Sequence, residues 1–160
     1  MTMTGPRPAV VDSRELTVTR TITIAAPLEK VWAAITEAEH IAAWFPQAAV
    51  LDEVAVGARG VFTWEGFGSL PVQIEELDPP RTIAYRWNNS HTRTVNPDAV
   101  DPDHSTVFRF TLEPIDGGTQ LTVVESGFGT LADPAASMES NRGGWDAELD
   151  ELVAYLEGGS

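Results

Sequence analysis

Glu125 is the residue of this sequence with the clearest capacity for chemistry. In "LTVVES" it follows Leu121 and Val123 at steps of two, so in a strand all three side chains point to one apolar face. A carboxylate in such a place is costly unless it is paired, hydrogen-bonded or protonated. Arg20 interrupts the apolar face of an earlier strand, and we expect it to pair with Glu125 if the two strands are neighbours.

This position allows two uses of the carboxylate. With Arg20 and the Tyr85 hydroxyl, Glu125 would form the polar anchor of an apolar cavity. With Tyr85 it is also the candidate catalytic pair, because catalysis by proton transfer needs at least two converging titratable groups. A structural ion pair, or a carboxylate exposed at the strand end before Gly127, is the open alternative.

Aromatic side chains are concentrated on the faces that we expect to point inward. Flat rings with few polar atoms often line a cavity for an apolar guest. A solid aromatic core without a void is the alternative interpretation. The candidate ligand-binding residues are Trp44, Phe45, Phe62, Trp64, Tyr85, Trp87, Phe108, Phe110, Glu125, Met138, Trp145 and Leu149.

Other chemistries lack the residues that they need. The three histidines, His40, His91 and His104, have no zinc-binding spacing, and the acidic run "DAVDPDH" lacks the glycine and final glutamate of a calcium loop. No nucleophile elbow, phosphate-binding loop or dinucleotide fingerprint occurs. We therefore expect neither a metal nor a cofactor.

Composition limits the partners and the compartment. The 160 residues carry a formal net charge of −14, which disfavours nucleic acid and anionic membranes, since both require clustered cations. The sequence has no cysteine and no apolar run long enough to span a membrane. We expect a leader over residues 1–15, one domain over residues 16–157, and a cytoplasmic location.

The elements that must position these side chains follow from the periodicity. Residues 16–24 alternate as a strand, and two short helices follow, the first starting at Pro27 and the second with Thr36 and Glu39 at capping-box spacing. Five further strands are predicted at residues 60–64, 70–77, 82–87, 105–112 and 119–128. The polar segment 88–105 is expected to be a loop that covers one end of the cavity.

A long helical region is predicted from Asp133 and Pro134 to the C-terminus. Its apolar stripe runs through Trp145 and Leu149, but Gly143 and Gly144 stand directly before the tryptophan. The pair predicts either a break in the helix or a place where the missing side chains allow close approach to the sheet or room for a guest.

Three segments carry a resemblance: "IAAPLEKVWAAITEAEHIAAWF", "STVFRFTLEPIDGGTQLTVVESGF" and "GGWDAELDELVAYLE". On them, the chain resembles the SRPBCC or START-like superfamily and, within it, the homologues of the activator of the heat-shock-protein-90 ATPase. The resemblance implies an α+β helix-grip fold, a curved antiparallel sheet of about six or seven strands around a long C-terminal helix. It also implies neighbouring first and last strands and an apolar cavity between sheet and helix.

Three functions remain open from the sequence. Binding of a hydrophobic small molecule, aromatic or lipid-like, ranks first because it needs only the cavity. A co-chaperone-like module for protein interaction ranks second and would expose an apolar patch. A polyketide cyclase or dehydratase that uses Glu125 ranks third. A protein partner or a homodimer stays open in each case.

Overall fold

The sheet and the long helix that the sequence predicts form the body of the protein. The computed structural model describes residues 8–45, 48–64, 68–88, 105–131 and 133–158. In this part of the chain, eight antiparallel strands form one sheet in the order β1-β2-β8-β7-β6-β5-β4-β3. The strands are β1 (Val10–Asp12), β2 (Thr17–Ile24), β3 (Ala48–Leu51), β4 (Arg59–Trp64), β5 (Gly68–Asp78), β6 (Thr82–Asn88), β7 (Ser105–Ile115) and β8 (Gly118–Ser126).

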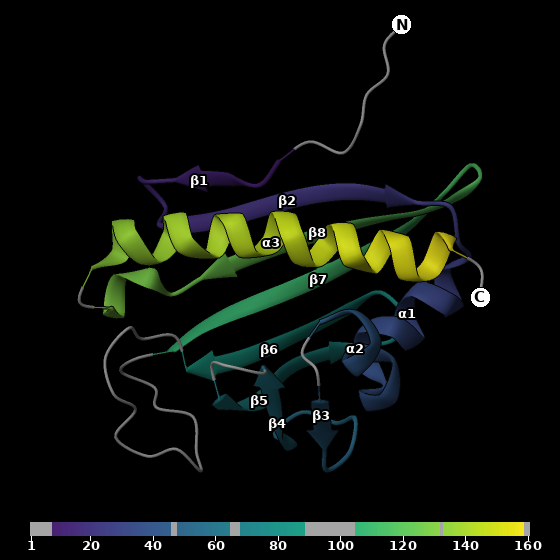
Figure 1. Cartoon of the computed structure of the whole chain (residues 1–160), viewed down its shortest axis with the longest axis horizontal. Helices are drawn as coiled ribbons and strands as arrows, with labels where there is room; N and C mark the ends of the chain where they lie inside the picture. The colour runs from purple at the N-terminus through teal and green to yellow at the C-terminus, as the bar shows by residue number, and fades with distance from the viewer. Residues whose placement is uncertain (1–7, 46–47, 65–67, 89–104, 132, 159–160) are drawn as a thin grey trace, which may run out of the picture.

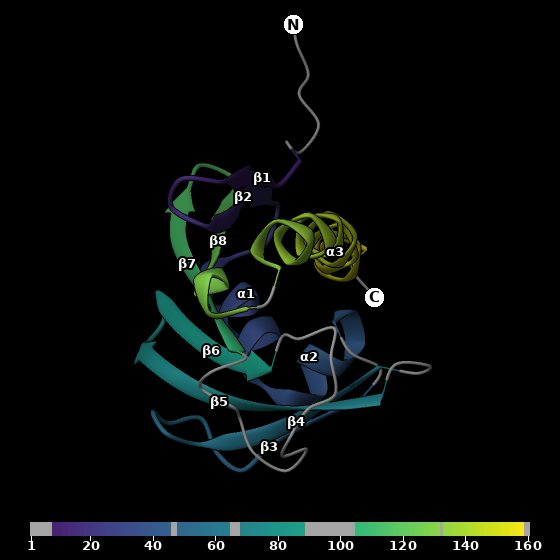
Figure 2. The same cartoon turned by 90° about the vertical axis from the view of Figure 1, so that its left-hand side faces the viewer.

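The helices lie on the concave side of the sheet. They are α1 (Leu28–Thr36), α2 (Ala38–Trp44), a short 3-10 turn (Phe128–Thr130) and α3 (Pro134–Glu157). The sheet curves around α3, with α1 and α2 on the same side (Figures 1 and 2). This is the helix-grip arrangement, and β2 and β8 are neighbours as the resemblance implies. Among the described helices, none combines the length and the apolar character that a membrane span requires.

The structure confirms the buried face that the period of two in the sequence predicts. On β7 and β8 the facing pairs Phe108–Glu125, Phe110–Val123 and Leu112–Leu121 have their side chains inside, at most 1% exposed. These pairs alternate with more exposed neighbours, as expected for a sheet with one solvated face. Glu125 therefore lies inside the protein, on the face that supports α3.

Two short strands raise the number above the six or seven expected. β3 pairs with β4, and β1 pairs with Thr17–Thr19 of β2. β1 lies within the segment assigned to a leader, so residues 10–12 belong to the sheet instead. Three residues are too few for an alternating pattern, and β1 is also held by a contact from another element: the Ala9 N–H donates to Asp146 of α3 at 2.6 Å.

Two predicted features fall on residues outside the described ranges. Residues 1–7 hold the beginning of the predicted leader. Residues 89–104, between β6 and β7, hold most of the predicted loop, with His91, His104 and the acidic run.

The capping box predicted at Thr36 is not formed. Glu37 occupies the N-cap position of α2, while Thr36 is still the last residue of α1. Its hydroxyl donates to the Trp32 carbonyl at 2.7 Å, the backward bond that threonine makes inside a helix.

The glycine pair does not interrupt α3. The helix is continuous from Pro134 to Glu157, and the Asp133 carboxylate caps its start by accepting from the Ala136 N–H at 3.1 Å. Both Gly143 and Gly144 are exposed, and a Cβ on either would meet no atom within 4 Å outside the local helix backbone. Close approach to the sheet is therefore not the reason for them, and no contact of the described residues explains the pair.

We expect Gly143→Ala combined with Gly144→Ala to raise the free energy of unfolding by about 1–2 kcal/mol, because alanine restricts the unfolded chain and favours the helix. Urea unfolding measures the change. Gly57→Ala is the matched control: it also has open space but a φ of 88°, so it should destabilise. A double variant no more stable than wild type would show that α3 requires the glycines in a conformation other than this continuous helix.

Candidate functional site

Glu125 is the centre of a buried polar cluster. It lies on β8 between Phe108 of β7 and Val18 of β2, and its side chain is fully buried. The inward direction that the sequence predicts is thus confirmed, and the exposed carboxylate at a strand end is excluded.

Four neutral donors from the described part of the chain hold this carboxylate. The indole N–H of Trp145 donates to Oε1 at 2.9 Å, and that of Trp87 donates to Oε2 at 3.0 Å. The Thr106 hydroxyl also donates to Oε2. The Asn141 amide nitrogen lies 3.0 Å from both oxygens. Because β6, β7 and α3 all supply donors, the cluster offsets much of the cost of taking the carboxylate out of water and joins the sheet to the helix.

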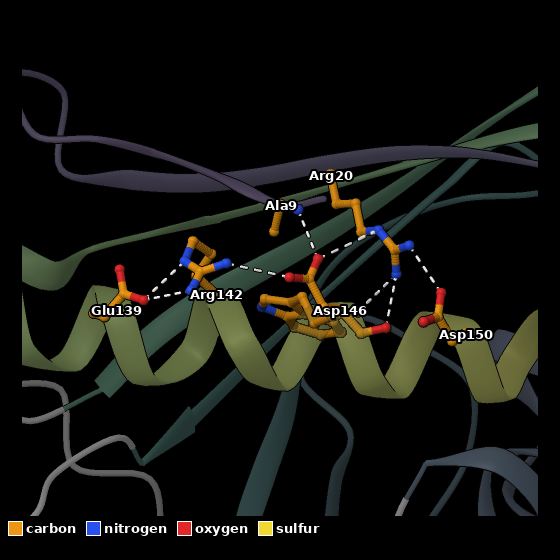
Figure 3. A network of polar contacts seen from close by, with 7 residues as sticks. Ala9, Arg20, Glu139, Arg142, Asp146 and Asp150 are labelled. Carbon is orange, nitrogen blue, oxygen red and sulfur yellow. Dashed lines mark hydrogen bonds and ion pairs between the residues drawn. The ribbon is translucent and has the colours of Figure 1, made fainter. Parts of the chain in front are cut away.

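Arg20 belongs to a different cluster, so the predicted ion pair with Glu125 is wrong. Its Nη2 lies 2.8 Å from Asp150 and its Nε 3.6 Å from Asp146, both on α3. Its Nη1 donates to the carbonyls of Asp146, at 2.9 Å, and Trp145, at 3.2 Å (Figure 3). Arg20 faces Val123 in the sheet, and its long side chain extends to α3, where these acceptors are one turn apart.

Tyr85 is also turned away from Glu125. Its hydroxyl donates to the Ile35 carbonyl of α1 at 2.6 Å, and burial raises its pKa well above the usual value for tyrosine. The structure therefore does not bring the Tyr85 hydroxyl to Glu125, and the two do not form the acid–base pair that catalysis would require.

The aromatic candidates pack in one cluster. Phe108 lies 4.6 Å from Trp87 and 5.2 Å from Trp145, measured between ring centroids. Contacts of this kind are those of a packed aromatic core, the alternative interpretation of the sequence, and a cavity remains a prediction. The side chain of Trp64 lies outside the described part, while the other predicted lining residues are buried: Trp44, Phe45, Phe62, Tyr85, Trp87, Phe108, Phe110, Met138, Trp145 and Leu149.

Three rings form what we call the aromatic triad: Phe45, Trp87 and Trp145. Their centroids are 5.6 Å apart for Phe45 and Trp145, 5.7 Å for Phe45 and Trp87, and 6.2 Å for the two tryptophans. Phe45 and Trp87 keep 7% and 9% of their surface exposed. Since both indoles donate to Glu125, one carboxylate orients two of the three rings.

Sequence reasoning missed Thr106 and Asn141, although each had a signal. Thr106 precedes Phe108 by two residues, so it continues the inward face of β7. Asn141 precedes Trp145 by four residues, so it lies on the same stripe of α3. The signal at both positions was a polar residue at the end of a stripe of apolar residues, as at Glu125.

One carboxyl group of α3 has a raised pKa. Glu148 is half-buried, three residues after Trp145, and burial together with the neighbouring Glu151 raises its pKa to about 7.

We expect the native state to bind the Glu148 proton more tightly than the unfolded chain, because its pKa is raised from 4.5. The contribution of this bound proton to the free energy of unfolding is fully present below pH 4.5 and is lost as the pH rises through about 7. Glu148→Gln should therefore stabilise the protein by about 1 kcal/mol above pH 7, allowing for solvent screening, and change little near pH 4. Thermal unfolding across this range measures the difference; an NMR titration midpoint near 4.5 for this carboxyl would contradict the prediction.

Among the described residues, one group has the ligand types for a metal ion. Glu37, Glu39 and His40 place their ligand atoms within 4.8 Å of one another. Both glutamates are exposed, and the His40 Nδ1 lies 2.6 Å from the Tyr155 hydroxyl of α3. We assign this group to the contact between α2 and α3.

Several solved structures are similar to this fold. MLL2253 from Mesorhizobium loti has a TM-score of 0.74 and 28% identity, with 90% of this chain and 98% of that chain covered. The Aha1 dimer from Colwellia psychrerythraea gives 0.67 and 20%, over 88% and 96% of the two chains. DynU16, a protein of the dynemicin biosynthetic locus, gives 0.70 and 21%, over 90% of this chain and 48% of that one. The last two similarities concern the fold alone. In a separate comparison of sequences, no curated protein matches the chain.

The family assignment comes from the sequence itself. Residues 25–157, which include both helices α1 and α2, the whole Glu125 cluster and α3, match the profile described as Activator of Hsp90 ATPase homolog 1-like protein. Together with the helix-grip fold, this match shows that the chain belongs to the family of activator of Hsp90 ATPase homolog 1-like proteins, within the SRPBCC superfamily.

Proposed function

We propose that this protein binds a hydrophobic small molecule, aromatic or lipid-like, between the sheet and α3. The observation that carries the proposal is the pair of indole N–H groups, from Trp87 and Trp145, that donate to the buried Glu125. A core that served stability alone would gain from apolar residues at these positions, because buried polar groups are costly to satisfy.

The cluster supports binding because it fixes rings at the edge of the core. Glu125 prevents the two indoles from rotating, and Phe45 and Trp87 retain exposed surface. Because these rings are already oriented, a flat apolar guest that binds where Phe45 and Trp87 border the surface orders few side chains, which lowers the entropic cost of binding. The net charge of −14 disfavours an anionic guest.

Native mass spectrometry of freshly purified protein tests this function, together with NMR titrations of two uncharged probes, naphthalene and 1-decanol. Retention of a small molecule, or saturable shifts of the Trp87 and Trp145 indole signals, would support binding. The Trp32 indole, which belongs to a half-buried ring of α1, is the internal control and should not move. Absence of both a retained mass and any indole shift would overturn the proposal.

A protein-interaction role is the second candidate, favoured by one observation on the other face of the sheet. Val50 of β3 and Val61 of β4 face each other across the strands and are 61% and 40% exposed. Neighbouring exposed valines at the edge of a sheet are typical of a contact surface.

The family name suggests the partner for this second test. Stimulation of the ATPase of a bacterial heat-shock protein 90 that is lost on combining Val50→Lys with Val61→Lys would support the role. Val10→Lys is the control, since Val10 is 62% exposed on β1 at the opposite edge of the sheet. Equal stimulation by all three proteins, or none by wild type, would remove it.

A further inference from the structure

We propose that Asn141, oriented by Glu125, accepts a hydrogen bond from the ligand and so selects apolar molecules that carry a hydroxyl or amino group. This inference rests on the proposed function and names the class of ligand that the same site would take. Glu125 is then a positioning residue rather than the group that contacts the ligand.

The orientation of the Asn141 side chain follows from chemistry. Its amide nitrogen lies 3.0 Å from Oε1 and 3.0 Å from Oε2 of Glu125. A carboxylate only accepts hydrogen bonds, so the NH2 of the amide must face it, and the reverse orientation would oppose three acceptor oxygens. The carbonyl oxygen Oδ1 is on the other branch of the amide and is directed away from Glu125.

This oxygen is the acceptor that remains available. No described residue donates to Asn141 Oδ1, and the residue is half-buried rather than enclosed. The oxygens of Glu125, in contrast, already accept hydrogen bonds, and the residue is fully buried. A ligand reaches the carboxylate only by displacing one of them, whereas it reaches Oδ1 without breaking a contact.

The aromatic triad supplies the other half of the recognition. Trp145 follows Asn141 by one helical turn, so the acceptor and the ring are about 6 Å apart along α3. A flat apolar molecule with a donor at its edge matches both. An ether or carbonyl in the same place would oppose lone pairs on Oδ1, and this repulsion produces selectivity.

A matched pair of probes tests the inference. We expect 2-naphthol, which donates a hydrogen bond, to bind the wild-type protein about 5- to 10-fold more tightly than 2-methoxynaphthalene, which cannot donate. Dissociation constants come from NMR titration of the Trp87 and Trp145 indole signals. Asn141→Leu should reduce the ratio to about one, because leucine keeps the volume and removes the acceptor. Gln120→Leu, which removes an amide from the half-buried part of β8, should leave the ratio unchanged.

A wild-type readout protects the test against a variant that fails to fold. The Asn141 side-chain amide signals should shift with 2-naphthol and much less with 2-methoxynaphthalene. Failure of both probes to bind would count against the proposed function itself. Equal binding of the two, or a preference that persists in Asn141→Leu, would overturn this inference and leave the proposed function standing.

Discussion

Glu125→Gln is expected to lower the free energy of unfolding by about 2–3 kcal/mol, although the side chain keeps its size. Both carboxylate oxygens accept from an indole: Oε1 from Trp145 and Oε2 from Trp87. A glutamine amide has one NH2, and in either orientation it faces one of these N–H groups donor to donor. The Trp87 N–H keeps the Thr106 hydroxyl as a second acceptor at 3.1 Å, but the opposed donors and the lost bonds to a charged acceptor still cost about 1–3 kcal/mol, and the Asn141 amide loses one of its two acceptors as well.

Urea unfolding monitored by near-UV circular dichroism measures both the stability and the packing of the two indoles. Glu113→Gln is the matched control, a carboxylate on the exposed face of β7, and should change stability by less than about 0.5 kcal/mol. If the two variants behaved alike, Glu125 would not be the acceptor that orients the rings. Its place at the centre of the candidate site would then be lost.

The inward face of the sheet was predictable because strand geometry leaves no choice. Side chains alternate with a period of two, so Phe108 and Phe110 on β7 and Val123 and Glu125 on β8 must share a face once the strands exist. That the first and last predicted strands are neighbours came from the family resemblance rather than from this pattern, and β2 and β8 are paired in the structure. The short strands β1 and β3 had no pattern long enough to predict them.

The partners of the buried polar residues were less predictable, for two physical reasons. Parity assigns Arg20 to a face, but it does not say in which direction a long side chain extends. The position of α3 across the sheet depends on tertiary packing, and it places Asp146 and Asp150 within reach of Arg20 and Asn141 within reach of Glu125. The candidate anchor was therefore found, while the donors that the described residues supply to it, namely Thr106, Asn141 and the indoles of Trp87 and Trp145, required the structure.

Arg20→Met is expected to lower the free energy of unfolding by about 2 kcal/mol. The Arg20 side chain is 3% exposed, and its guanidinium joins β2 to α3 through Asp146, Asp150 and the Trp145 carbonyl. Methionine replaces the buried stem but leaves these acceptors without the cation. Removing one partner of a buried pair costs about 3–5 kcal/mol, and the value here is smaller because Asp150 is 63% exposed and Asp146 also contacts Arg142 (Figure 3).

Arg109→Met provides the comparison, since that arginine is 52% exposed and pairs with Glu76 across the outer face of the sheet. It should change stability by less than about 0.5 kcal/mol, the usual value for a solvated ion pair. Arg20→Met should in addition shift the Trp145 indole signal, because Arg20 holds the backbone of that residue and Trp145 in turn donates to Glu125. Equal stabilities for the two variants, with an unchanged Trp145 signal, would mean that α3 keeps its position without Arg20. The orientation of the triad would then depend on the Glu125 cluster alone.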